Sequence, residues 1–197
     1  MKPGRTNPRV LGMGFSPRKR GNSDLLLEWA LKSARENGVR TKKLMVREYQ
    51  VQPCLGCRYC EEYGECIQKD DFKIFEKELE RADILIISTP VFFLGVPGKA
   101  KGLIDRFQSF WARKYLFDQP LARENRPALL LICAGSDSPD IFEPSLRTIR
   151  AFLEVAGFKL KAKVEVKGVD EKGAVKEVKG LKEKVSRGVI KLLKASS

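Results

Sequence analysis

Four cysteines fall within thirteen residues, in the stretch CLGCRYCEEYGEC at positions 54–66. Three thiols separated by two-residue gaps, followed by a fourth after five residues, can surround a cubane whose iron corners each take one thiolate. Zinc ribbons usually hold two widely separated C-x2-C pairs, and a redox dithiol needs only one pair. The spacing therefore favours an iron–sulfur centre, while zinc, disulfides and free thiols stay open. The candidate metal ligands are Cys54, Cys57, Cys60 and Cys66.

A second candidate site is the stretch GFSPRKRGNSDLLL at positions 14–27. It lacks the Gly-Lys-Ser/Thr of a P-loop and the third glycine of a Rossmann fingerprint, whose place Pro17 takes. Hydroxyls, an amide and cations leading into a helix N-terminus suit a phosphate monoester. The alternative is that Asn22 and Ser23 only cap the helix. The candidate phosphate-binding residues are Ser16, Pro17, Arg18, Lys19, Gly21, Asn22 and Ser23.

A third stretch, STPVFFLGVPGKAKGLIDRF at positions 88–107, is apolar and bulky where a loop is usually polar. Such a loop at a ligand-binding edge indicates a flat hydrophobic ligand or an interface. The alternative is ordinary core packing by the two phenylalanines. A small polar loop at 133–140 could contact the edge of the same ring. The candidate ring-binding residues are Pro90, Val91, Phe92, Phe93, Leu94, Gly95 and Gly135.

The surrounding pattern alternates strands and helices. Apolar, β-branched runs predict strands at 8–15, 42–48, 81–90, 126–136 and 158–166. Amphipathic stretches predict helices at 23–38, 99–115 and 144–157 and in the lysine-rich C-terminal segment. Five strands separated by helices imply a doubly wound parallel α/β sheet in a single domain, 1–197, whose ligands bind at the carboxyl ends of the strands. The cysteines occupy a long connection after the second strand, at about 50–70.

GFSPRKRGNS followed by TPVFFLGVPGKAKGLIDR resembles the NADPH-dependent FMN reductase-like flavoproteins, and the cysteine pattern resembles the iron–sulfur flavoproteins among them. The resemblance implies a flavodoxin-like fold, FMN on the two loops described above, and a [4Fe–4S] cluster on the four cysteines. It also implies a homodimer or dimer of dimers that brings cluster and flavin together across an interface. Ser23, Thr89 and Phe92 replace the family's usual Thr, Ser and Tyr, and Phe92 removes one hydroxyl near the flavin.

The composition narrows the functional class. The chain has a formal net charge of +13, no histidine and no apolar run long enough to span a membrane. We expect no secretory signal and a cytoplasmic protein with reduced thiols. Without histidine a Cys2His2 zinc finger is impossible, and no RNP-like aromatic motif is present, so we expect no nucleic-acid binding.

The sequence therefore predicts a redox flavoprotein. An acidic ferredoxin-like donor would dock on the basic surface, and electrons would pass through the cluster and FMN to an unknown acceptor. The chemistry belongs to the cofactors, so no catalytic acid or base is assigned. The alternatives are an NAD(P)H-dependent FMN or quinone reductase and a zinc-stabilised binding module.

Overall fold

Five parallel strands form one sheet in the order β2-β1-β3-β4-β5. They are β1 (Arg9–Gly14), β2 (Arg40–Met45), β3 (Ile84–Pro90), β4 (Arg126–Cys133) and β5 (Phe158–Val166). The computed structural model describes residues 8–120 and 123–196, so residues 1–7, 121–122 and 197 of the predicted domain lie outside the described part. This strand order is that of the flavodoxin-like fold. The predicted doubly wound sheet is therefore confirmed.

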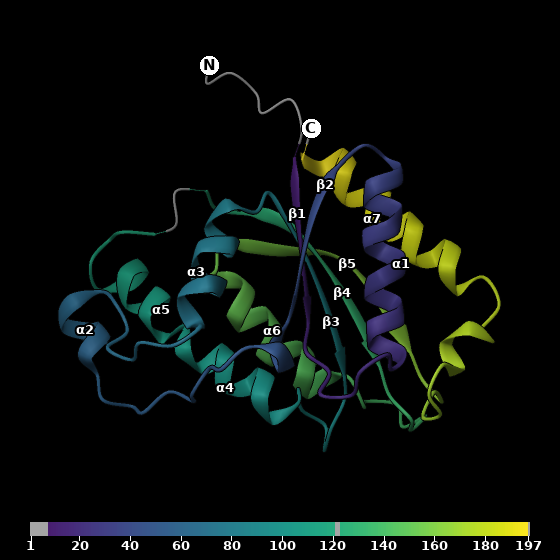
Figure 1. Cartoon of the computed structure of the whole chain (residues 1–197), viewed down its shortest axis with the longest axis horizontal. Helices are drawn as coiled ribbons and strands as arrows, with labels where there is room; N and C mark the ends of the chain where they lie inside the picture. The colour runs from purple at the N-terminus through teal and green to yellow at the C-terminus, as the bar shows by residue number, and fades with distance from the viewer. Residues whose placement is uncertain (1–7, 121–122, 197) are drawn as a thin grey trace.

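Helices cover both faces of the sheet (Figure 1). One face packs against α1 (Asn22–Glu36) and α7 (Leu181–Ser196), which also contact each other. On the other side lie α3 (Phe72–Arg81), α4 (Gly98–Arg106), α5 (Gln108–Tyr115) and α6 (Glu143–Val155). The short α2 (Tyr59–Tyr63) packs against α5, and 3-10 turns η1 (Val46–Glu48) and η2 (Ala174–Lys176) complete the described elements. None of the helices in the described part combines the length and apolar character of a membrane span.

The central strands β3 and β4 are buried on both faces, as their continuous apolar runs indicate. Alternate residues enter different hydrophobic clusters, because successive side chains of a strand point to opposite faces. Leu85 and Ile87 pack with the α3–α6 side, whereas Ile84 and Ile86 pack with α1 and α7. The two clusters hold the loops at the carboxyl edge of the sheet in fixed positions.

Several predicted boundaries are corrected by the structure. The helix expected at 99–115 is two helices, because the chain changes direction at Phe107, whose ring is buried against Phe72, Phe110 and Phe152. The strand expected at 42–48 ends at Met45, because η1 begins at Val46, and the strand expected at 126–136 ends at Cys133.

The helix α3 was not predicted, although Phe72, Phe75 and Leu79 have helical spacing and are buried. Because α3 runs to Arg81, the strand expected at 81–90 begins only at Ile84. The short α2, which contains Cys60, was also not predicted.

Arg126, the first residue of β4, connects the ends of two helices at the amino edge of the sheet. The candidate phosphate and ring loops follow the carboxyl ends of the strands. Its guanidinium donates to the carbonyls of Leu79 and Ala82 at the end of α3 and of Ala156 at the end of α6, each at 2.7 Å. The side chain is 6% exposed, and burial, with the nearby positive charge of Arg123, lowers the pKa of Arg126 to about 10. The role of Arg126 is therefore structural.

Candidate functional site

The loop between β1 and α1 leads into a helix N-terminus that no side chain among the described residues caps. Gly21 is the N-cap residue and forms no side-chain capping hydrogen bond, so the first turn of α1 presents its backbone N–H groups. Upstream, the Ser16 hydroxyl accepts a hydrogen bond from Arg18 N at 3.1 Å and folds the loop into a tight turn. An uncapped helix N-terminus at the carboxyl edge of a parallel sheet suits a phosphate group.

The tip of this loop is fixed by Asp24. Arg20 has a left-handed backbone (φ 56°), and its N–H donates to Asp24 Oδ2 at 2.9 Å. Arg47 of η1 forms an ion pair with the same carboxylate, and the pair is buried. The sequence analysis missed both Asp24 and Arg47. Both residues hold the loop through its backbone, at Arg20 and Ser16, and neither lines the candidate ligand site.

Asn22 has a different role from the predicted one. Its side-chain amide donates to the carbonyls of Val169 and Glu171 at 2.9 Å, and its Oδ1 accepts from Gly173 N at 2.9 Å. The side chain therefore holds the segment after β5, and only the backbone of Asn22 remains for an anion. The contact brings residues 169–173 to the same edge of the sheet.

A small cavity of about 70 Å³ opens where these loops meet. It is lined by the predicted residues Ser16, Arg18, Gly21, Asn22, Ser23, Pro90, Val91, Phe92 and Gly135, and by Cys133 and Ala134 of the predicted 133–140 loop. Val169 and Asp170, which the sequence analysis missed, complete the lining. The predicted residues Pro17, Lys19, Phe93, Leu94 and Gly95 do not line it. Pockets that enclose a whole drug-sized ligand measure roughly 300–1,000 Å³. This cavity can hold one end of an FMN molecule, and the flavin ring would lie on the open surface beyond it.

Gly135 allows the loops to approach closely. A Cβ atom at this position would lie 3.0 Å from Cβ of Asp170 and 3.2 Å from its carboxylate. Because Gly135 has no side chain, the chain after β4 can lie directly against Asp170 on the wall of the cavity. Gly135 and Arg18 therefore line one narrow cavity beside the first turn of α1.

The loop after β3 ends in a strained apolar turn. Phe92 and Gly95 exchange two backbone hydrogen bonds of 2.9 Å, and the residues between them, Phe93 and Leu94, have φ values of 47° and 64°. Bulky residues rarely adopt such left-handed conformations, which glycine and asparagine prefer. The Phe93 side chain is fully exposed, and Ser145 anchors the turn by donating to the Leu94 carbonyl at 3.0 Å. Strain that presents an aromatic ring to the surface is typical of a binding element.

The four clustered cysteines line one large cavity. It has a volume of about 800 Å³ and lies between the cysteine segment (residues 52–70), α4, α5 and α6. The backbone turns at Gly56, Arg58 and Gly64, all with left-handed φ values, which wrap the segment around this space. The predicted ligands Cys54, Cys57, Cys60 and Cys66 are thus brought together on one cavity, and Cys133 lies elsewhere.

The thiols are not gathered around a single ion. In the described residues, no three cysteine or carboxylate side chains are placed to hold one metal. Cys54 and Cys57 are exposed, and Gly56 N donates to Cys54 Sγ at 3.4 Å. Burial, followed by the charges of Cys54 and Cys66, raises the pKa of the Cys60 thiol. The four thiols line one cavity in a chain without histidine, and such an all-sulfur donor set fits a thiolate-bound cluster as well as zinc.

One further residue of this cavity, Arg106, was not predicted. It is buried on α4 and contacts the cysteine segment. Burial alone would lower the pKa of Arg106, but hydrogen bonds and charges from Asp70 and Cys66 raise it overall. The sequence carried no signal for this role, because Arg106 stands 36 residues from Asp70.

Comparison with solved structures supports the fold. The chain superimposes on RosB bound to 8-demethyl-8-formylriboflavin-5′-phosphate with a TM-score of 0.70 and 18% identity, covering 95% of this chain and 79% of that one. It superimposes on the NAD(P)H:quinone oxidoreductase of Methanothermobacter marburgensis with a TM-score of 0.67 and 19% identity, covering 93% and 96%. At such identities these likenesses show a common fold.

Sequence comparison is more specific. The chain is 38% identical over 98 residues to an iron-sulfur flavoprotein of Methanocaldococcus jannaschii, covering 50% of this chain and 51% of that protein. It is 31% identical over 149 residues to an iron-sulfur flavoprotein of Methanosarcina thermophila, covering 76% and 74%. The chain thus spans about half the length of the first relative. Residues 8–167 match the family model described as NADPH-dependent FMN reductase. The chain belongs to the NADPH-dependent FMN reductase family.

Proposed function

We propose that this oxidoreductase is a flavoprotein that binds FMN and a [4Fe–4S] cluster and passes electrons from an acidic ferredoxin-like donor to an acceptor. The observation that carries the proposal is the cavity shared by Cys54, Cys57, Cys60 and Cys66, in a chain whose strand ends form a phosphate-sized site. Relatives named iron-sulfur flavoproteins support it. The reducing cytoplasm, where thiols stay reduced, is the proposed location.

Different residues of this chain would bind the phosphate and the ring of FMN. Backbone N–H groups at the start of α1 and the Arg18 guanidinium would hold the FMN phosphate. Pro90, Val91 and Phe92 would lie along the ring, and Gly135 would admit its edge. When bound, the cluster would supply one-electron chemistry and the flavin would supply exchange between one- and two-electron chemistry.

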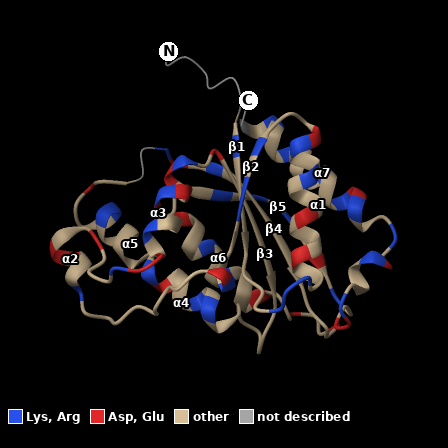
Figure 2. Ribbon diagram, in the orientation of Figure 1, with Lys and Arg blue, Asp and Glu red and all other residues tan. Residues whose placement is uncertain are grey.

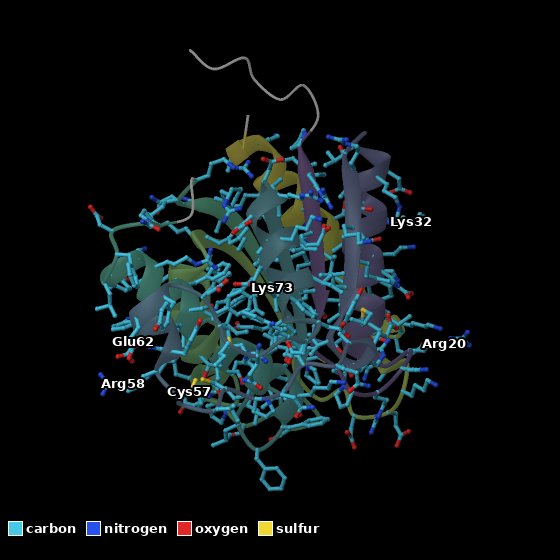
Figure 3. All side chains as sticks on the ribbon, turned by 60° about the vertical axis from the view of Figure 1, so that its left-hand side comes forward. Arg20, Lys32, Cys57, Arg58, Glu62 and Lys73 are labelled. Atoms are coloured by element: carbon cyan, nitrogen blue, oxygen red, sulfur yellow. The ribbon has the colours of Figure 1, made fainter. Side chains whose placement is uncertain are left out.

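A second copy of the chain is part of the proposal. The cavity at the cysteines and the cavity at α1 share no lining residue. Cys57 and Arg20, which mark these two regions, lie on opposite sides of the molecule in Figure 3. The exposed Phe92, Phe93 and Leu94 form an apolar turn beside the flavin site. These features support a homodimer, or a dimer of dimers, in which one chain's cysteine segment lies near the other chain's flavin.

The proposed donor is acidic because the chain carries a net charge of +13. Figure 2 shows Lys and Arg on helices of both layers and acidic residues on α2. This helix contains Cys60 followed by Glu61 and Glu62. Reduction by an acidic ferredoxin should therefore slow as salt rises. Glu62→Gln should accelerate it by about twofold at low salt, since a repulsive charge near the cysteines is removed.

The control is Glu177→Gln, which removes the same charge on the exposed C-terminal cap of η2. It should change the rate much less. Stopped-flow reduction over a salt series measures both variants, and a rate independent of salt would contradict an acidic donor.

An NAD(P)H-dependent FMN or quinone reductase is the second candidate. Membership of the NADPH-dependent FMN reductase family favours it. Anaerobic mixing with NADPH separates the two functions: rapid bleaching of the flavin band would favour the reductase. Slow bleaching by NADPH with rapid bleaching by reduced ferredoxin would favour the electron-transfer protein.

The first test is an anaerobic absorption spectrum with flavin, iron, sulfide and zinc quantified per chain. We expect about one flavin, four irons and four sulfides. Cys60→Ala should lose iron and sulfide, and the control Cys133→Ala should keep both. Flavin without iron or sulfide after reconstitution would contradict the cluster and favour the plain reductase. A colourless protein with stoichiometric zinc would instead indicate a zinc-stabilised binding module.

A further inference from the structure

Arg106 forms hydrogen bonds with both ends of the cysteine segment, and we call this arrangement the closure of the segment. Its Nη1 donates to the carbonyl of Gln52 at 2.9 Å, and its Nη2 lies 3.3 Å from the carbonyl of Gln68. These two carbonyls flank the four cysteines on either side. One guanidinium from α4 therefore ties together the beginning and the end of the segment.

Asp70 completes this closure. Its two carboxylate oxygens accept from Arg106 at 2.7 and 3.2 Å, and Oδ2 also accepts from Gln52 N at 2.9 Å. Oδ1 accepts from Phe72 N at 3.0 Å, which fixes Asp70 to the start of α3. A bond from Gln68 Nε2 to the Pro53 carbonyl, at 3.0 Å, reinforces the joint. The segment is thus anchored to the rigid core by charge-assisted hydrogen bonds.

The guanidinium also belongs to the wall of the cysteine cavity. Arg106 is 1% exposed and lines that cavity with all four cysteines, and the Cys66 sulfur is one of its neighbours. Its Nε is buried without a hydrogen-bond partner in the described part of the chain. The guanidinium thus places its positive charge in the wall of the cavity that the four thiols share.

We infer that Arg106 is a positioning residue for the cluster: it joins the two ends of the cysteine segment and holds a permanent positive charge beside Cys66. The inference rests on the proposed function, because Cys66 acts there as a ligand. A cluster bound by four thiolates is anionic and gains negative charge on reduction. A fixed buried cation therefore favours its reduced form.

Two variants separate this electrostatic role from simple support of the loop. Arg106→Gln removes the positive charge, so the midpoint potential of the cluster should become more negative. Asp70→Asn removes the negative charge of the same pair, so the potential should become more positive. Loosening of the segment alone would shift both variants in the same direction. Arg106→Lys keeps the charge and should restore most of the wild-type potential.

The control is Arg126→Lys, at a second buried arginine whose described hydrogen bonds are to backbone carbonyls away from the cysteine segment. It should leave the iron content and the potential unchanged. Iron, sulfide and a spectroscopically monitored redox titration are measured for each folded, reconstituted protein. Equal iron content and equal potentials in wild type, Arg106→Gln and Asp70→Asn would overturn the inference.

Amide hydrogen exchange on the unloaded proteins tests the closure without any cofactor. Residues 52–70 should exchange at least about tenfold faster in Arg106→Lys and Asp70→Asn, while α1 stays protected. Unchanged exchange would overturn the closure even if Arg106→Gln fails to fold. A wild type that takes up no iron or sulfide would overturn the proposed function and the charge role of Arg106 with it. The exchange result would still decide separately whether Arg106 closes the segment.

Discussion

Arg47 forms an ion pair of 2.8 Å with Asp24, and the same guanidinium donates to the Ser16 carbonyl at 3.1 Å. Both side chains are largely buried, with exposed fractions of 14% and 5%. Asp24 in turn accepts the Arg20 N–H. The loop between β1 and α1 is therefore fixed by Arg47, a residue of η1, the 3-10 turn that follows β2.

Arg47→Met should destabilise the flavin-free protein and weaken FMN binding. Removing one partner leaves Asp24 buried without its counter-charge, which costs about 3 kcal/mol. Loosening of the loop should raise the FMN dissociation constant about tenfold, or about 1.4 kcal/mol. Lys43→Gln breaks an exposed pair with Glu28 and should cost under about 0.5 kcal/mol. Urea unfolding and flavin titration measure both variants, and equal stability of the two would contradict the role of Arg47.

Gly135→Ala should lower both stability and FMN affinity. The added methyl group would meet the Asp170 side chain at 3.0 Å, and overpacking of this kind costs about 1–3 kcal/mol. Gly98→Ala is the matched control, because its added carbon would have no neighbour within 4 Å and Gly98 starts α4. Thermal unfolding and FMN titration should show a loss only at Gly135. Unchanged stability and FMN affinity in Gly135→Ala would contradict the importance of the close approach to Asp170.

Leu94→Gly should stabilise the flavin-free protein by about 1 kcal/mol, because glycine adopts a left-handed backbone without steric cost. The apolar contact with flavin or with a second copy should weaken at the same time. Leu116 has the same exposed fraction, 51%, but an ordinary φ of −102°, so Leu116→Gly should gain nothing. Urea unfolding with sedimentation analysis checks both effects. A destabilised Leu94→Gly would show that the turn is not strained.

The Cys133 thiol should resist alkylation under conditions in which the exposed clustered cysteines are alkylated. Burial raises the pKa of its thiol to about 12, so at pH 9 it stays protonated and shielded. In the unloaded protein, iodoacetamide should modify the exposed Cys54 and Cys57 at least about 100-fold faster, as peptide mass spectrometry would show.

The same shift affects stability. The folded state retains a proton that the unfolded state loses near pH 9, so stability is lost as pH rises from about 9 towards 12. Cys133→Ala should show a shallower decline over this range. Identical pH profiles of wild type and variant would contradict the raised pKa.

The sequence predicted the parts of this molecule that depend on local pattern. Continuous apolar runs such as Ile84–Ile87 indicate buried strands, and the loops follow from where the strands end. The four-cysteine spacing identifies its cavity because the ligands are neighbours in the chain. Contacts between distant residues left no such pattern. Asn22 binds Val169, 147 residues away, so its side chain was assigned to a ligand instead.

The same limit explains the missed supporting residues. Arginine is frequent in this basic chain, and Arg47 and Arg106 look in the sequence like ordinary surface charges. Only the fold shows that they are buried against Asp24 and Asp70. The break at Phe107 was missed for a related reason, because it follows from aromatic packing between α5, α6 and α3 rather than from a glycine or proline.

Helix α4 begins directly after the loop of Phe92 and Leu94 and ends at Arg106. Its nine residues form a stiff rod of about 13 Å. This rod connects the segment that follows the Phe92–Gly95 turn to the residue that holds the two ends of the cysteine segment together. If a ligand at one site changes the affinity for a ligand at the other, the reverse effect must by reciprocity have the same magnitude.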